Sequence, residues 1–457
     1  MMTSFFVMAG LQAGSAETLD SALSRAYVNN PSLNATRAEV RSTDENVPRA
    51  KSGYRPRVTG TADAGLSIVE SDTPAGVASG LSAHSENTRK LRPRGYGLQV
   101  DQNLFTGFRT ENSVRQAETA SLGARETLRN NEQNTLFNSA SSYMNVLRDT
   151  AILDLQRNNV EVIEEQLRQT RDRFNVGEVT RTDVAQAESR LAAARSQASL
   201  AEANLRTSVA VYRQTIGVEP RQLAPGRPLD RLLPRNVDSA LKIAFSEHPA
   251  IKASLHGVDA AELQVKIEEG ALAPSVGLSG SVANRFDNNS FGDRAISASA
   301  AIQLTVPIYD GGVASASTRQ AKETAGQRRL ESDSIRDQVR AAVISSWGQL
   351  ESARAQILAA QAQVEASETA LNGVREEARV GQRTTLDVLN AQQELLNARV
   401  NLITAQRDRV VASYAVVQAS GRLNSQALGL AVAHYSPKVH FDQVKDAWHG
   451  LTTPDGR

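Results

Sequence analysis

Residues 173–184 read RFNVGEVTRTDV, and residues 377–388 read EARVGQRTTLDV. Gly177 aligns with Gly381 and Asp183 aligns with Asp387, in both cases at an offset of 204 residues. Glycine favours the end of a helix, and Asp or Thr favours the position that caps the start of the next helix. Each stretch therefore predicts a turn between two antiparallel helices, and the chain is predicted to contain one architecture twice.

A long helix is predicted before each turn. Residues 107–176 contain no proline and keep a helical pattern, which at about 1.5 Å per residue gives a helix on the order of 100 Å long. Apolar residues recur every seven positions, as in a coiled-coil seam, at Val146, Leu153, Val160, Leu167 and Phe174, and in the second half at Val343, Leu350, Ile357, Val364 and Leu371. Shorter helices are predicted after the turns, over residues 182–217 and 386–423.

Short strands are predicted before each long helix. Residues 57–69, 96–105, 276–282 and 296–308 alternate apolar residues at even-numbered positions with polar residues at odd-numbered positions, which is typical of strands with two different faces. Residues 70–94 are predicted to form a loop with a basic end. Pro56 and Pro274 stand at an offset of 218, against 204 at the turns, so the first hairpin loop is 14 residues longer than the second.

The number of strands decides how their backbone N–H and C=O groups can be paired in a membrane. The smallest membrane barrels have eight strands, and an open sheet edge in lipid leaves backbone groups unpaired. Three chains with four strands each would supply twelve. The strands therefore predict a membrane barrel shared by three chains, and the single seven-residue stripe of the helices suits a curved wall of paired helices. A soluble sandwich packed on its even-numbered faces and an ordinary elongated coiled coil are the open alternatives.

The segments divide as follows. Residues 1–16 are predicted to be a signal peptide cut after Ala16, with a frayed hydrophobic terminus as the alternative. The first structural repeat spans residues 17–217, a proline-rich linker spans 218–234, and the second repeat spans 235–423. Residues 424–457 are predicted to be an irregular polar tail.

Composition excludes several classes of function. The chain has no cysteine, a net charge of +1 and no apolar run long enough for a membrane-spanning helix. These features speak against thiolate metal sites and against a nucleic-acid partner. No His/Glu metal spacing, nucleophile elbow or phosphate-binding glycine loop is found, so neither an enzyme nor a bound cofactor is expected.

The repeat, the two turns and the proline dipeptides that start each repeat together resemble a known family. Residues 17–425, with Asn30-Pro31 and His248-Pro249 at the start of the two repeats, are similar to the TolC-type outer membrane channel-tunnels, the outer membrane efflux proteins. The resemblance implies a mainly α-helical, internally duplicated fold in which a homotrimer builds a twelve-stranded barrel in outer membrane lipid and a long helical tunnel in the periplasm. The linker and the tail would form an equatorial belt.

The same resemblance implies a function and partners. Such channels work passively in the efflux of toxic compounds or in type I protein secretion, together with a periplasmic adaptor and an inner-membrane efflux pump or ABC transporter. The adaptor would meet the two turns at Gly177, Glu178, Gly381 and Gln382. A periplasmic coiled-coil adaptor is the alternative reading, although an adaptor is expected to carry lipoyl-like or barrel domains that these short strand pairs do not resemble.

The resemblance also implies a closed periplasmic end. Asp387 and Asn390 would form the pore constriction, and Arg383 would reach Thr182 or Asp183 of the adjacent chain as a gate link.

This sequence departs from the family pattern at two positions. Asn390 stands where the family has a second aspartate, and Ala378 stands where the best-known member has an aromatic gate residue. The alternative for Asp387 is a helix cap or a first-turn carboxylate, and for Arg383 a solvated turn residue.

Overall fold

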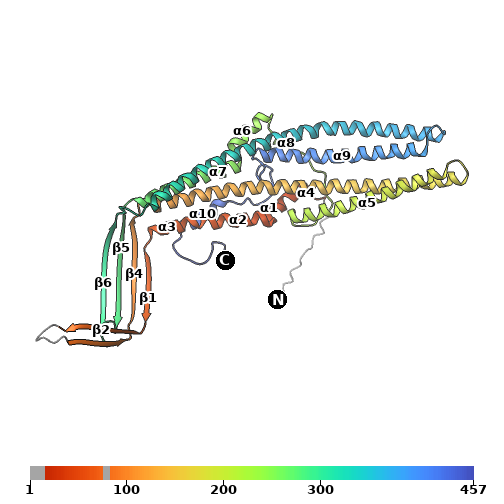
Figure 1. Ribbon diagram of the computed structural model, residues 1–457. Coiled ribbons are helices and arrows are strands. Elements are labelled where there is room, and N and C mark those ends of the chain that lie inside the picture. The colour runs from red at the N-terminus through yellow and green to blue at the C-terminus, as the bar shows by residue number, and fades with distance from the viewer. Residues whose placement is uncertain (1–15, 76–82, 457) are drawn as a thin grey trace, which may run out of the picture. The chain divides into compact units, whose positions relative to one another are not determined.

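The computed structural model describes residues 16–75 and 83–456 (Figure 1), so the predicted signal peptide lies outside the described residues apart from Ala16. Its contacts divide the chain into two units. A helical unit comprises residues 16–40, 124–254 and 331–436, and a second unit, which carries the strands, comprises the remaining described residues.

The helices follow the predicted duplicated order. They are α1 (Leu19–Asn29), α2 (Pro31–Asp44), α3 (Asn46–Lys51), α4 (Arg109–Asn175), α5 (Arg181–Ile216), α6 (Val237–Glu247), α7 (Pro249–Glu269), α8 (Val313–Arg379), α9 (Thr385–Ala419) and α10 (Pro437–Val444), with short 3-10 turns at Ser52–Tyr54 and Gly270–Leu272. Helices α4 and α8 both have 67 residues, and α4–α5 and α8–α9 form the two hairpins in Figure 1.

The duplication extends to caps and ion pairs. The side chain of Thr18 caps α1 and that of Asn236, 218 residues later, caps α6. In the first hairpin Arg195 pairs with Glu164 at 2.6 Å, and in the second hairpin Arg399 pairs with Glu368 at 2.5 Å, again 204 residues later. Equivalent residues therefore hold equivalent helices together in both repeats.

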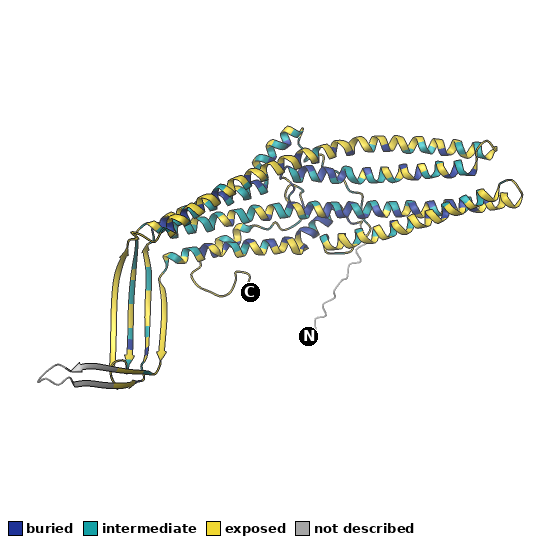
Figure 2. Ribbon diagram, in the orientation of Figure 1, coloured by how far each residue is buried: buried dark blue, intermediate teal, exposed yellow. Residues whose placement is uncertain are grey.

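The largest core of the helical unit lies where α1, α2, α4, α5 and α9 meet. It contains the fully buried side chains of Tyr143, Tyr212 and Tyr414. The predicted linker packs on this core, because the Tyr143 hydroxyl lies 2.7 Å from the carbonyl oxygen of Glu17 and 2.6 Å from that of Ala224. In Figure 2 buried residues gather here on the helices.

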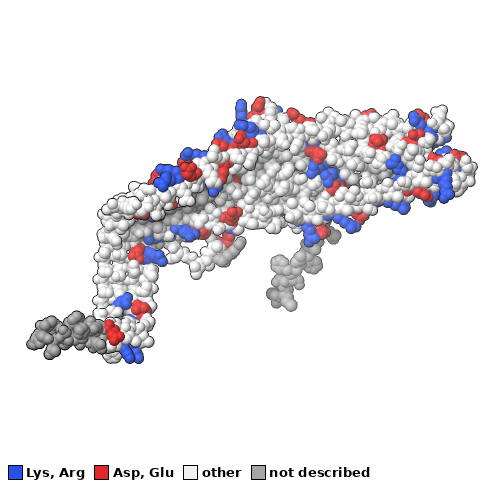
Figure 3. Space-filling view, viewed as in Figure 1, with Lys and Arg blue, Asp and Glu red and all other residues white. Residues whose placement is uncertain are grey.

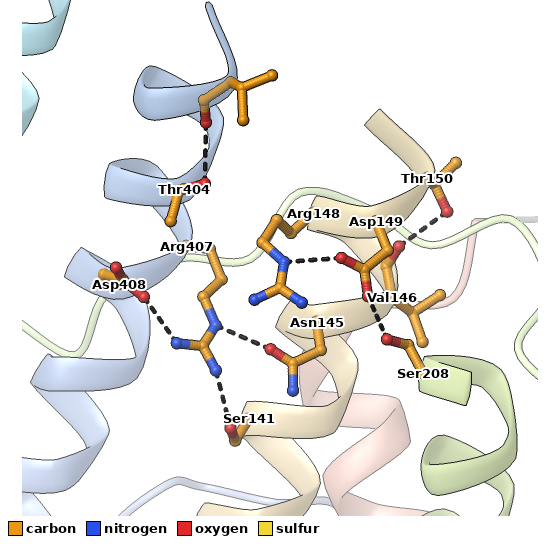
Figure 4. Close-up of polar contacts among 11 residues, drawn as sticks. Ser141, Asn145, Val146, Arg148, Asp149, Thr150, Ser208, Thr404, Arg407 and Asp408 are labelled. Carbon is orange, nitrogen blue, oxygen red and sulfur yellow. Dashed lines mark hydrogen bonds and ion pairs between the residues drawn. The ribbon is translucent and has the colours of Figure 1, made fainter. Parts of the chain in front are cut away.

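A polar junction joins the two repeats beside this core (Figure 4). Arg407 of α9 donates through Nε to Asn145 of α4 at 2.9 Å and through Nη2 to Ser141 at 3.3 Å. One turn further along α4, the buried carboxylate of Asp149 accepts hydrogen bonds from Arg148 and from Ser208 of α5. Helix α4 is thus bonded to a helix of its own repeat and to one of the other repeat.

The strands form a four-stranded antiparallel sheet in the second unit. Its order is β1 (Arg57–Ala64), β4 (Arg94–Phe105), β5 (Ser275–Phe286) and β6 (Arg294–Thr305). Even-numbered residues pair with even-numbered residues across it, for example Leu98 with Val282 and Val282 with Ala298. The predicted apolar face is therefore confirmed as one continuous face, and many of its large side chains are exposed (Figure 2).

Two details of the strand prediction were wrong, and a third feature, a register shift in β4, was not predicted. Strand β1 ends at Ala64, and part of the predicted loop forms a separate hairpin of β2 (Ser67–Ala75) and β3 (Ala83–Leu91). This hairpin is made by backbone pairing between polar segments that lack the alternation used to recognise strands. In β4 the register shifts between Asn103 and Phe105, so that Phe105 instead of Leu104 pairs with Val276.

The C-terminal segment is also more ordered than the predicted irregular tail. Leu430 is buried in the core of the helical unit, and the backbone N–H of Tyr435 donates to the Tyr27 hydroxyl at 3.0 Å. In the second unit, the segment contains α10, whose buried His440 lies 3.3 Å from the buried carboxylate of Asp44. Buried apolar side chains within a mostly polar segment explain why composition alone did not reveal this packing.

Among the described residues, none of the helices is both long enough and apolar enough to cross a membrane.

Gly421, just after α9, provides a test of the packing within the second repeat. Its φ of +81° is left-handed, and a Cβ added there would lie 2.7 Å from the Cα of His248. Gly381 has a similar φ of +80° but open space around it. We expect Gly381→Ala to lower the free energy of unfolding by about 1–2 kcal/mol through backbone strain. Gly421→Ala should cost about 1–3 kcal/mol more through the clash.

Denaturant unfolding in detergent, followed by helical circular dichroism, measures both changes. Equal losses in the two variants would contradict the close approach of Gly421 to His248.

Candidate functional site

The two predicted turns have the same backbone conformation. Gly177 and Gly381 are left-handed, with φ of +81° and +80°. The N–H of the residue after each glycine donates back into the preceding helix, from Glu178 to the carbonyl of Arg173 and from Gln382 to that of Glu377, both at 2.9 Å. This is a common way to end a helix, and the left-handed residue explains why glycine stands there.

Each following helix opens with a capping box. The N-caps are Thr180 and Thr384, and the first-turn carboxylates are Asp183 and Asp387. The backbone N–H groups of the two threonines donate to these carboxylates at 2.9 and 3.0 Å. Two free N–H groups at each helix start are satisfied in this way, which stabilises the reversal of the chain.

The capping contacts also set the charge of the two aspartates. Hydrogen bonds from the Thr180 hydroxyl and N–H hold the pKa of Asp183 below its usual value. The N–H and hydroxyl of Thr384 do the same for the pKa of Asp387. Both groups therefore carry a negative charge at neutral pH, and Asp387 acts as a first-turn carboxylate within this chain.

Arg383 has a partner within its own turn. Its Nε lies 2.8 Å from Oε2 of Glu377, and this contact raises the pKa of the guanidinium. Among the described residues, no hydrogen bond or ion pair joins Arg383 to Thr182 or Asp183, which lie at the start of α5 in the other hairpin. A link from Arg383 to another chain therefore stays a prediction, and it would compete with Glu377.

Asn390 is engaged by a residue that sequence reasoning missed. Nη2 of Arg190 on α5 donates to Oδ1 of Asn390 on α9 at 2.7 Å. The bond joins the first hairpin to the second, within about three turns of the start of α5 and of α9. Arg190 lies seven residues after Asp183, and so on a similar side of α5, but only the packing of the helices shows which side chain it meets.

Apolar packing places Asn390 against α5. The neighbouring Leu389 is 2 % exposed and packs with Ile163 and Leu167 of α4 and with Leu191 of α5. Val388 instead packs within the second hairpin, against Leu371 and Leu395. Leu389 therefore faces the first hairpin, while Val388 faces its own hairpin. Asn390 directly follows Leu389 and contacts α5.

An open groove of about 540 Å³ lies near the turns, between α4 and the second hairpin. Its lining is mostly polar and charged and includes Gln169 and Arg173 of α4 and Arg375 of α8. The half-buried Ala378 also lines it. The position at which the family resemblance places a gate aromatic therefore borders a space that alanine leaves unfilled.

Comparison with known proteins identifies the family. The model of the family described as "Outer membrane efflux protein" matches residues 22–218 and 240–422, one match for each repeat. The chain belongs to the outer membrane efflux protein family. The outer membrane efflux protein BepC of Brucella suis is 45 % identical over 450 residues, which cover 98 % of this chain and 94 % of that protein.

More distant relatives share the fold. The outer membrane protein TolC of Escherichia coli is 25 % identical over 433 residues, covering 90 % of this chain and 84 % of TolC. The crystal structure of the Campylobacter jejuni outer membrane channel CmeC superposes with a TM-score of 0.76 at 16 % identity, covering 93 % of this chain and 89 % of that one. The predicted fold class and outer membrane location are confirmed, and the alternatives of a sandwich, a plain coiled coil and an adaptor are not supported.

The family is one of transport channels. Among residues 16–75 and 83–456, no group of three or more His, Cys, Asp or Glu side chains is arranged to hold a metal ion. The turns at the ends of the two helical hairpins offer charged side chains and hydrogen-bonding groups.

The contact between Arg190 and Asn390 can be tested by spin labelling, since the chain has no cysteine. Labels on cysteines placed at Glu178 and Gln382 report the distance between the two turns. A typical intramolecular hydrogen bond stabilises by about 0.5–1.5 kcal/mol net, and this one lies at an exposed site. Arg190→Ala should therefore broaden the distance distribution and shift it to longer values.

Arg168→Ala is the matched control, because the ion pair of Arg168 with Glu165 lies within α4 and does not join the two hairpins. A distribution that Arg190→Ala leaves unchanged would show that Leu389 and its neighbours hold the hairpins without this bond.

Proposed function

We propose that this outer membrane efflux protein works as a homotrimeric channel-tunnel, in which three four-stranded sheets close a twelve-stranded barrel in outer membrane lipid. The observation that carries the proposal is the order of the sheet, in which β1 and β6 are its two edges. Edge strands present unpaired backbone N–H and C=O groups, which lipid cannot satisfy. Joining β6 of one chain to β1 of the next pairs these groups.

The faces of the sheet support the same arrangement. Ile302 and Leu304 are 70 % and 63 % exposed in the single chain, as expected for side chains that contact lipid. The opposite face carries Ser281 and Ser299, whose hydroxyls lie 2.9 Å apart, and it suits a wet lumen. Strands of 8 to 12 residues are close to the roughly 9–11 that a tilted strand needs to span a bilayer.

The paired helices would form the periplasmic tunnel. The linker of residues 218–234 and the C-terminal segment pack on the core of the helical unit, which supports the proposal that they belong to a belt around its equator. The turns at Gly177, Glu178, Gly381 and Gln382 are exposed and alike in backbone, so a trimer would present six similar tips. We propose that these tips meet a periplasmic adaptor, which joins the channel to an inner-membrane efflux pump or ABC transporter.

The same tips would close the pore. Three Asp387 carboxylates near the trimer axis would concentrate negative potential in a narrow opening. Asn390 adds no charge, and its side-chain oxygen is already bonded to Arg190, so the field would depend on Asp387. Release of Arg383 from Glu377 toward Asp183 of the adjacent chain would supply a gate link at the outer side of this ring.

Two classes of cargo are candidates, small toxic compounds and polypeptides. The family description as efflux proteins favours small toxic compounds, and the 45 % identity to an efflux protein over almost the whole chain favours the same class. Export of polypeptides through a type I system is the second candidate, because the alkaline protease secretion protein AprF of Pseudomonas aeruginosa is 26 % identical over 346 residues.

The barrel is tested by two substitutions on neighbouring residues in the middle of β6. A charge at position 300 would face lipid near the midplane, so Ala300→Arg should destabilise the barrel by about 2–4 kcal/mol. Ser299→Arg would face the lumen and should have little effect. Analytical ultracentrifugation in detergent should show three chains per particle for the unchanged protein and for Ser299→Arg, with a loss of trimer for Ala300→Arg. A stable monomer of the unchanged protein would refute the architecture.

The constriction is tested by removing each first-turn aspartate in turn. Asp387→Ala and Asp183→Ala remove the same capping contacts from α9 and α5, so they disturb the turns alike. In planar bilayers with a salt gradient, Asp387→Ala should move the reversal potential toward that of a non-selective pore, because a ring of three charges is lost. Asp183→Ala should leave most of the cation preference. If both variants kept the original reversal potential, Asp387 would be only a helix-capping residue.

A further inference from the structure

A row of charged and aromatic side chains crosses the sheet at the end of its apolar face. Arg94 of β4 pairs with Phe286 of β5, and Phe286 pairs with Arg294 of β6. The guanidinium carbons of the two arginines lie 5.4 and 5.6 Å from the centre of the Phe286 ring. Both arginines are exposed, and Phe286 is half-buried between them.

This row shares its face with the residues proposed to contact lipid. All three residues are even-numbered, like Leu98, Val282 and Ile302, and even-numbered residues pair with one another across the sheet. The next row along holds Tyr96 and Asn284, whose side-chain amide donates to the Tyr96 hydroxyl at 3.0 Å. The face therefore passes from aliphatic to amphipathic to cationic over a few residues, as expected where a membrane surface begins.

The two guanidinium groups are held in place. Nη1 of Arg94 lies 2.8 Å from Oδ2 of Asp287, a buried carboxylate in the turn after β5, while the Arg94 side chain remains 58 % exposed. Nε of Arg294 donates to Oδ1 of Asn284 at 3.4 Å. Each contact uses one of the five N–H donors of a guanidinium, so both groups keep donors for an outside ligand.

The local charge favours an anion. Arg94, Arg294 and Arg89, whose Nη1 donates to the carbonyl of Asn289 in the same turn at 3.0 Å, together outweigh Asp287 and Asp293 by one positive charge. The nearby carboxylate of Asp293 accepts hydrogen bonds from the backbone N–H groups of Asn288, Asn289 and Ser290. These bonds direct the carboxylate toward the backbone of the loop. In Figure 3 the sheet is largely white, and charged side chains gather toward its ends.

The helices fix which end of the sheet carries this row. Helices α4 and α8 follow the strand ends at Phe105 and Thr305, so Arg94 and Arg294 lie at the opposite end, beside the turn between β5 and β6. With the tunnel in the periplasm, this end of the barrel reaches the outer leaflet. The step rests on the proposed function, because it needs the barrel to stand in the outer membrane.

We propose that Arg94, Phe286 and Arg294 form a binding site for the phosphate groups of lipid A, the phosphorylated glycolipid of the outer leaflet. Arginine binds phosphate through paired N–H donors and suits such a site better than lysine. The two arginines lie on strands that flank β5, about 10 Å apart at the usual strand spacing. That separation suits a headgroup with more than one phosphate, while its acyl chains would cover the aliphatic rows next to it.

Native mass spectrometry of the detergent-solubilised protein tests the site with two probes, diphosphorylated lipid A and the same lipid without phosphates. The unchanged protein should bind the phosphorylated lipid at least about tenfold more tightly. The double variant Arg94→Gln/Arg294→Gln should lose this preference and bind both lipids alike. Equal binding of both lipids by the unchanged protein would overturn the proposal without any variant.

Arg285→Gln is the matched control. Arg285 precedes Phe286 on the same strand but faces the other side of the sheet, where it lies 3.6 Å from Asp63. It should keep the preference for the phosphorylated lipid, and an equal loss in this variant would show only a general effect of charge. Competition by inorganic phosphate at matched concentration would point to an anion site that is not specific for lipid.

The oligomeric state separates this inference from the proposed function. Sedimentation of the same samples as monomers would refute the channel itself. Intact trimers that bind both lipids alike would refute only the lipid A site.

Discussion

Unpaired backbone groups at the edges of a β-sheet are the constraint on which the proposed assembly depends. The four-stranded sheet has open edges at β1 and β6, and its even-numbered face exposes aliphatic side chains. In water such a face would be covered by other side chains, and in lipid such edges would be costly. A closed barrel of three chains satisfies both conditions together, and the tunnel follows because a long helix continues from the last strand of each repeat.

The duplicated turns show how one backbone solution serves two roles. Both use a left-handed glycine and a Thr-Asp capping box, and both place an ionised aspartate in the first turn of the following helix. The capping contacts are identical, so any difference in function between Asp183 and Asp387 must come from where each helix lies in the assembly. Arg190 adds a further asymmetry, because it ties the second hairpin to the first through Asn390.

The two departures from the family pattern take on a physical meaning in this structure. Ala378 borders an open groove between α4 and the second hairpin, so a contact that a larger side chain would make is absent at that position. Asn390 lacks the charge of an aspartate but accepts a hydrogen bond from Arg190 within its own chain. The closed state proposed here would thus depend more on hydrogen bonds between the two hairpins of one chain. It would depend less on contacts between chains and on the charges of aspartates near the trimer axis.

The sequence by itself determined the duplicated plan, the two turns and the two-faced strands, because each is encoded by local signals: Gly177 and Gly381, the threonines and aspartates that cap, and alternation along β5 and β6. It did not reveal the β2–β3 hairpin, the register shift at Leu104, the packing of Leu430 and α10, or Arg190 as the partner of Asn390. These were decided by tertiary structure, because backbone pairing between polar strands and contacts between side chains about 200 residues apart leave no periodic trace in the chain.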